Sequence, residues 1–128
     1  MNLSEGYRIM LCYLDSYYWR SKLDELGGLL GSMSLLSDNT PADSAFEEYW
    51  KVAVSQIVDE KNSYTLSSDN IYKAMIVFLY NWADLGSDGT IYGVCAYLEK
   101  SSSKDEDWQK AVDTVMAGND ESYLNFMI

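Results

Sequence analysis

The sequence predicts an all-α protein of about six helices, and two observations support this prediction. Apolar residues recur at the three- and four-residue spacing of amphipathic helices, and no segment shows the alternation of a half-buried strand. Serine, glycine and proline separate these segments where helices are expected to begin and end. At 128 residues the chain has the length of one domain with a substantial core. We therefore expect a single all-α domain over residues 1–128.

An internal repeat divides the chain into two units of three helices. Tyr7–Leu14 matches Tyr72–Leu79 at an offset of 65 positions (72 − 7), with Tyr, Met and Leu identical. A later block, 47–54, matches 105–112 at an offset of 58 positions (105 − 47). Two copies are too few for a stacked repeat array to be stable. We therefore interpret the two units, at about 3–59 and 66–118, as halves of one domain.

The first unit begins with two amphipathic helices. Ser4 is the expected N-cap of a helix over 4–20, and Ser21 is a possible cap for a second helix that reaches Met33. The second helix contains three glycines, and each costs about 1 kcal/mol relative to alanine. Either the close approach of another helix or of a partner's backbone offsets this cost, or the helix is poorly formed.

A loop and a third helix complete the first unit. The turn-forming residues 37–41 predict the loop. Ser44 and Glu47 have the spacing of a capping box, which predicts a helix that extends to about residue 59. Residues 60–63 then link the two halves.

The second unit repeats this order. A serine at 67–68 caps its first helix, and Gly86 ends that helix as a C′ residue. A shorter helix starts at 87–88. The last full helix contains Trp108 and ends near Gly118, and the apolar C-terminal segment after it is expected to pack back onto the domain.

The composition argues against several kinds of chemistry. The chain has no histidine, which excludes histidine-based triads and removes the commonest metal ligand. The glycines at 27–31 lack the spacing of a phosphate-binding loop, and the segment at 84–89 lacks the carboxylates of a calcium loop. Cys12 and Cys95 have no C-x-x-C partner, and we interpret them as buried, reduced thiols. We predict no catalytic residue, no metal site, no cofactor and no enzymatic activity.

The net charge of −11, from 20 acidic and 9 basic residues, limits the possible partners. This charge opposes direct binding to nucleic acid or to an anionic membrane. It agrees with simple solubility or with a basic protein partner. No apolar run approaches the ~20 residues of a membrane span, and the N-terminus lacks a signal-peptide pattern, so we expect a cytoplasmic protein.

No lysine or arginine occurs between Leu23 and Trp50, and this segment carries acidic and aromatic residues instead. Such a surface suits a basic protein partner. The alternative is a solvated face whose acids serve their own helices. The candidate partner-binding residues are Asp24, Glu25, Asp38, Asp43, Glu47, Glu48 and Tyr49.

The first half also carries a pattern of residues that resembles a known family. The pattern consists of Gly6-Tyr7, Met10, Tyr13-Leu14, Asp24-Glu25-Leu26-Gly27, Leu29-Leu30, Met33, Leu36, Asp38, Pro41-Ala42-Asp43 and Tyr49-Trp50. It resembles the immunity proteins of bacterial polymorphic toxin and contact-dependent growth inhibition systems, most clearly over residues 3–54. The resemblance implies a cytosolic, non-enzymatic protein that binds and blocks one cognate toxin, often a nuclease. Because nuclease domains are commonly basic, the acidic charge agrees with that implication.

A second interpretation comes from a different class of protein. The chain is then a non-enzymatic helical adaptor or dimerisation domain without a toxin partner. In that case the glycine-bearing helix packs against its copy in a homodimer. The gene next to this one distinguishes the two interpretations, because an immunity protein is expected beside a toxin gene.

Overall fold

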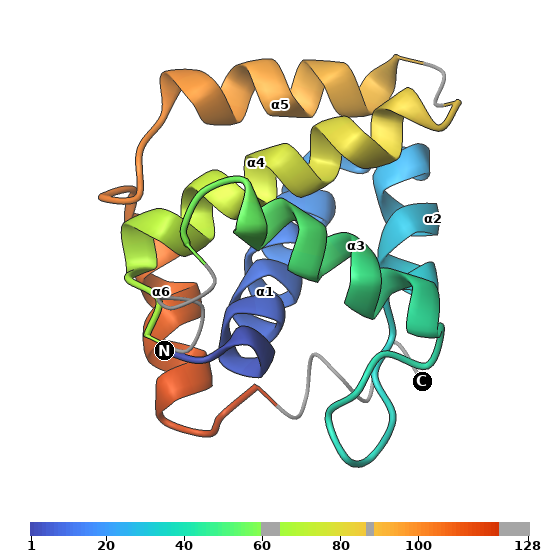
Figure 1. Ribbon diagram of the computed structural model, residues 1–128. Helices are drawn as coiled ribbons and strands as arrows, with labels where there is room; N and C mark the ends of the chain where they lie inside the picture. The colour runs from blue at the N-terminus through green and yellow to red at the C-terminus, as the bar shows by residue number, and fades with distance from the viewer. Residues whose placement is uncertain (60–64, 87–88, 121–128) are drawn as a thin grey trace.

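Six α-helices joined by short connections form the part of the chain that the structure describes, residues 1–59, 65–86 and 89–120 of a computed structural model (Figure 1). The helices are α1 (Leu3–Ser21), α2 (Asp24–Ser32), α3 (Ser44–Ser55), α4 (Ser68–Asp84), α5 (Thr90–Lys100) and α6 (Glu106–Met116). Among the described residues, the only pairing of β type is an isolated bridge between Leu35 and Pro41. The predicted all-α class and the number of helices are therefore confirmed.

The helices of the two predicted units interlock. The most extensive pairs are α6 on α1 and α3 on α4, and α2 and α5 pack on α1 and α4 respectively (Figure 1). The third helix of each unit therefore packs mainly on the first helix of the other unit. Because of this exchange, neither unit has a core of its own, and the helices form one domain.

Two buried hydrogen bonds recur at the offset of 65 positions. The hydroxyl of Tyr7 donates to the carbonyl oxygen of Met33 at 2.9 Å, and the hydroxyl of Tyr72 donates to that of Leu98 at 2.7 Å. Each bond ties the first helix of a unit to the end of the second helix. The interpretation of the units as copies of one repeat remains a prediction, and these bonds agree with it.

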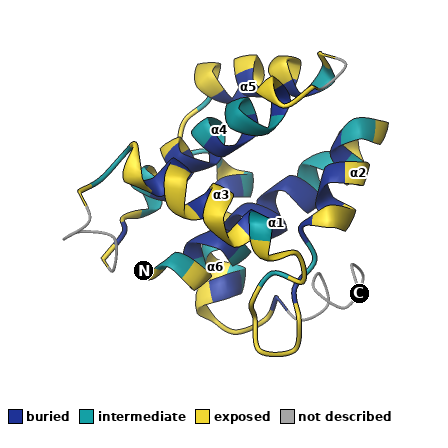
Figure 2. Cartoon of the chain, turned by 45° about the vertical axis from the view of Figure 1, so that its right-hand side comes forward, coloured by how far each residue is buried: buried dark blue, intermediate teal, exposed yellow. Residues whose placement is uncertain are grey.

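The core is apolar at the positions that the two units share. Leu14 and Leu79 have no exposed surface, and α5 turns one face inward while its outer face is exposed (Figure 2). Cys12 and Cys95 are buried free thiols. Burial raises the pKa of each thiol to about 12, so both are protonated at neutral pH.

The first two helices begin elsewhere than predicted. Asn2, not Ser4, is the N-cap of α1, because Asn2 and Glu5 form a reciprocal capping box. Ser21 is the last residue of α1 and caps nothing, and α2 follows Leu23 without a side-chain cap. Only two residues separate the helices, and the first of them, Lys22, is the left-handed C-cap of α1.

The third helix is capped by an aspartate rather than by the predicted capping box. The carboxylate of Asp43 accepts a hydrogen bond from the backbone N–H of Ala45 at 3.0 Å, and Ser44 is already the first helical residue. The carboxylate of Glu47 instead pairs with the ammonium of Lys51 at 3.4 Å. The helix ends at Ser55, earlier than the predicted residue 59.

In the second half, Ser67 caps α4 as predicted by accepting from the N–H of Asn70. Gly86 has φ of 123°, which agrees with its predicted role after the helix end. The helix α5 begins at Thr90, with Gly89 as its N-cap residue. The predicted linker at 60–63, the predicted start at 87–88 and the C-terminal segment after residue 120 lie outside the described residues.

Candidate functional site

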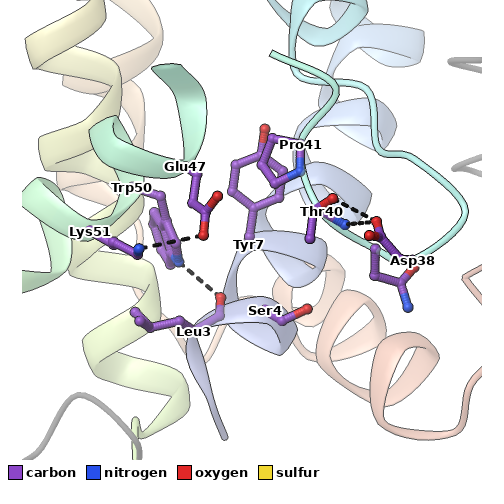
Figure 3. Close-up of a pocket in the computed structure, with 10 residues that line it drawn as sticks. Leu3, Ser4, Tyr7, Asp38, Thr40, Pro41, Glu47, Trp50 and Lys51 are labelled. Atoms are coloured by element: carbon purple, nitrogen blue, oxygen red, sulfur yellow. Dashed lines mark hydrogen bonds and ion pairs between the residues drawn. The ribbon is translucent and has the colours of Figure 1, made fainter. Parts of the chain in front are cut away.

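A cavity of about 300 Å³ opens between the start of α1, the α2–α3 connection and α3 (Figure 3). Its walls include the aromatic rings of Tyr7 and Trp50 and the ring of Pro41. Asp38 and Glu47 contribute acidic groups to the same cavity. We call it the loop cavity, and it brings together residues nine positions apart (47 − 38) that the sequence placed in different elements.

The α2–α3 connection is an ordered hairpin. Leu35 and Pro41 form the isolated bridge, and Asn39 adopts a left-handed conformation with φ of 66°. The carboxylate of Asp38 accepts hydrogen bonds from the hydroxyl and the backbone N–H of Thr40. These bonds lower the pKa of Asp38, so its negative charge is fixed beside the cavity at neutral pH.

The first turns of α3 add further charge. The ammonium of Lys51 lies 3.4 Å from a carboxylate oxygen of Glu47 and 3.8 Å from one of Glu48. Burial raises the pKa of Tyr7, and the negative charge of Asp43 adds to that shift. One lysine thus pairs with two acids, and with Asp43 at the cap this end of α3 keeps a net negative charge.

The remaining predicted acids lie on another element. Asp24 and Glu25 occupy the first turn of α2, and Asp24 lines a separate cavity of about 350 Å³ with Tyr18 and Trp19, which we call the α1–α2 cavity. The structure therefore brings Asp38 and Glu47 together in the loop cavity, with Asp43 at the cap and Glu48 in the first turns of the same α3, and places Asp24 and Glu25 apart from them.

The glycines of α2 have different explanations. A Cβ atom on Gly27 would lie 2.6 Å from Cε1 of Tyr18, so any other residue there would force that ring to move. A Cβ atom on Gly28 or Gly31 would meet nothing within 4 Å. The helix is well formed in spite of its glycines, and close approach within the chain explains Gly27 alone.

One buried carboxylate in the α1–α2 cavity was not found from the sequence. Asp15 is only 5% exposed and lines the cavity. Burial raises the pKa of Asp15, and a hydrogen bond from Trp19 partly opposes that shift. No salt bridge among the described residues involves Asp15.

Tyr49 lies on the other flank of α3, in an apolar groove of about 310 Å³ between α3 and α4. We call it the α3–α4 groove, and its lining residues are Tyr49, Val52, Gln56, Phe78, Asn81, Trp82 and Leu85. Leu85 was not predicted as a site residue, because its position before Gly86 was interpreted only as the end of a helix. At the offset of 65 positions Leu85 matches Arg20. An apolar residue where the other unit has a charged one could have marked Leu85 as a candidate site residue.

The described residues offer no arrangement for metal chemistry or for crossing a membrane. They contain no group of three or more His, Cys, Asp or Glu side chains that could hold a metal ion. None of their helices has the combination of length and apolar character that a bilayer span requires. Comparison with protein-family models, curated proteins and solved structures found no match.

Proposed function

We propose that this protein is an immunity protein, an inhibitory binding protein that neutralises one cognate toxin by covering a basic active site. The observation that carries the proposal is the gathering of acidic groups around the loop cavity. Asp38 and Glu47 line the cavity, and Asp43 and Glu48 belong to the cap and the first turns of α3. Complementary charge of this kind steers a basic partner to the surface and fixes its orientation.

Inhibition would act by occlusion. A nuclease holds the phosphates of its substrate with basic side chains, and the acids around the loop cavity present a competing negative surface to those groups. The aromatic walls formed by Tyr7 and Trp50 suit the aliphatic part of a lysine or arginine side chain. A volume of about 300 Å³ accommodates one or two such side chains and is at the lower limit for a small-molecule site.

One observation favours the alternative, a helical adaptor or dimerisation domain. Gly28 and Gly31 are exposed and face open space, so a second helix could approach the backbone of α2 closely. Sedimentation velocity distinguishes the alternatives. A stable dimer that Gly28→Leu dissociates would support the dimerisation domain, whereas a monomer supports an inhibitor that acts as a single chain.

The direct test reverses charge beside the loop cavity with Glu47→Lys and Glu48→Lys. Asp43 is a poor choice because it caps α3, and loss of the cap costs about 1 kcal/mol by itself. The assay co-expresses the chain with the C-terminal domain of the protein encoded immediately upstream and scores colony survival. The unmodified chain is expected to restore survival, and the double variant is expected to lose most of that protection.

A matched control applies the same charge change to α6, with Glu106→Lys and Asp113→Lys. Glu106 forms the same kind of exposed pair, with Lys110, as Glu47 forms with Lys51. The control is expected to protect as well as the unmodified chain. Equal protection by all three chains, or no protection by the unmodified chain, would refute the proposal.

A further inference from the structure

We infer that the α3–α4 groove is the docking site for large apolar side chains carried on a basic segment of the partner protein. This inference rests on the proposed function, because it specifies the chemistry of the partner that the acidic surface would attract. It also assigns a role to the flank of α3 that faces away from the loop cavity.

Three of the apolar side chains that line the groove are exposed to solvent. Leu85 is 66% exposed, Val52 47% and Tyr49 37%. Behind them the aromatic layer is continuous, since the ring of Phe46 lies 5.4 Å from that of Tyr49 and 5.6 Å from that of Trp82. A contiguous apolar patch of this kind is typical of an interaction surface.

The other half of the molecule shows that the fold does not require this patch. At the offsets of 58 and 65 positions, Tyr49 matches Asp107 (107 − 49) and Leu85 matches Arg20 (85 − 20). Arg20 and Asp107 form an ion pair at 2.6 Å on the surface of α1 and α6. The same architecture thus accepts charged residues at these positions, and the apolar pair on α3 and α4 needs another explanation.

The charges around the groove favour a basic partner over a second copy of this chain. Glu48 stands one turn before Val52 on α3, and Asp84 stands next to Leu85 on α4, and both acids are exposed. Lys51 lies 3.8 Å from Glu48, and Asp84 accepts a hydrogen bond from the hydroxyl of Tyr92. No lysine or arginine is among the described residues that line the groove. In a symmetric dimer the patch would face itself and bring these acids together, whereas a basic segment would pair with them.

The shape of the groove limits the occupant. Two packed helices with apolar residues between them commonly receive the apolar face of an amphipathic helix. A volume of about 310 Å³ holds one or two large side chains rather than a long peptide. The inferred occupant is therefore a short cationic segment that inserts one or two leucine-sized or aromatic side chains.

The test titrates the protein with a synthetic amphipathic peptide of leucine and lysine, with the leucines on one helical face. Amide NMR shifts are expected to concentrate on Tyr49, Val52 and Leu85. The double variant Tyr49→Asp with Leu85→Arg copies the ion pair of the other half and leaves the net charge unchanged. It is expected to bind the peptide at least about tenfold more weakly, since a buried leucine contributes enough free energy for that change.

Three controls separate apolar docking from other effects. A peptide with serine in place of leucine keeps the lysines and is expected to bind at least about tenfold more weakly than the leucine peptide. Met116→Gln removes an exposed apolar side chain from α6 and is expected to leave the affinity unchanged. Val52→Gln is a second groove variant, at an exposed position of α3, in case the double variant melts at a lower temperature.

The inference would be overturned by equal binding of the double variant and the unmodified protein, or by equal binding of the two peptides. A dimer of the unmodified protein that the double variant dissociates would also overturn it, because the occupant would then be a second copy. Failure of the inference alone would leave the effect of Glu47→Lys and Glu48→Lys on cell survival in place. Failure of the proposed function alone would remove that effect and leave peptide binding at the groove.

Discussion

One set of interior contacts, around a buried tryptophan, recurs in both halves of the molecule. The indole N–H of Trp50 donates to the carbonyl oxygen of Leu3, and the indole N–H of Trp108 donates to the hydroxyl of Ser68, both at 2.9 Å. A tyrosine of the same half packs edge-on against each indole, with ring centroids 6.4 and 5.1 Å apart. The acceptors differ in kind, a backbone carbonyl and a side-chain hydroxyl, but both indoles occupy the same place in the packing.

The surfaces of the halves differ at all three sites described above. The loop cavity is lined by the α2–α3 connection at 33–43, which is longer than the α5–α6 connection at 101–105. The α1–α2 cavity contains Asp15 and Gly27, whereas the matching positions of the second half hold Tyr80 and Tyr92, whose rings lie 6.2 Å apart. The groove of α3 and α4 is replaced by an ion pair on α1 and α6. Packing constrains the shared interior, so differences between the halves are the best guide to function.

The largest expected effect comes from removing a buried leucine side chain from the core of each half. Leu14→Ala and Leu79→Ala each empty a fully buried position, and each is expected to lower the free energy of unfolding by about 2–5 kcal/mol. Urea denaturation of both variants measures the two losses. A loss near zero at either position would show that the halves do not share this core site.

The next effect separates two ion pairs whose cations stand at matching positions, Arg8 with Asp120 and Lys73 with Asp69. Arg8 lies 2.7 Å from Asp120, and their side chains are 17% and 2% exposed. Arg8→Met leaves the buried carboxylate without its cation and is expected to cost about 3 kcal/mol. The pair of Lys73 and Asp69 is 57% and 54% exposed, so Lys73→Met is expected to cost less than about 1 kcal/mol.

Thermal and urea denaturation of the two methionine variants provides the comparison. Both substitutions keep an unbranched side chain in a helix, so helix propensity changes little. Equal losses would mean that burial does not distinguish the two pairs. Added salt is expected to weaken the exposed pair and to affect the buried pair much less.

The smallest expected effect concerns Asp15, which stands where the other half has Tyr80. Burial raises the pKa of Asp15 in the folded protein above its value in the unfolded chain. The protonated carboxyl therefore favours the folded state at low pH, and this contribution is lost as the pH rises through the folded pKa. Asp15→Asn keeps an acceptor for Trp19 and is expected to raise the melting temperature at neutral pH.

The advantage of Asp15→Asn is expected to shrink as the pH falls through the folded pKa of Asp15, because the wild-type carboxyl is then neutral. Melting curves at neutral and at acidic pH measure the change. Asp113→Asn, at an exposed position of α6, is the control. A lower melting temperature for Asp15→Asn at neutral pH would indicate that the ionised carboxylate stabilises the fold.

Several features could be predicted from the sequence because they depend on short-range pattern. Helical periodicity marked Leu14 and Leu79 as core, and the helix count followed from the same pattern and from the turn residues between segments. The acidic character of 23–50 was evident from composition. Caps were predicted less well, because Asn, Asp, Ser and Thr can all cap a helix, and at α1 and α3 the residue with the right backbone geometry was Asn2 or Asp43.

Only the tertiary structure decided which helices meet. Periodicity identifies the buried face of one helix and carries no information about its partner, so the sequence alone did not predict the packing of α3 on α4 and of α6 on α1. This packing places Tyr49 and Leu85 in one groove, and the hairpin of the α2–α3 connection places Asp38 and Glu47 in one cavity. The sequence by itself determined the class of fold, the apolar core positions such as Leu14 and Leu79, and the excess of acid. The sites depend on contacts between residues distant in the chain, which packing and connection length control.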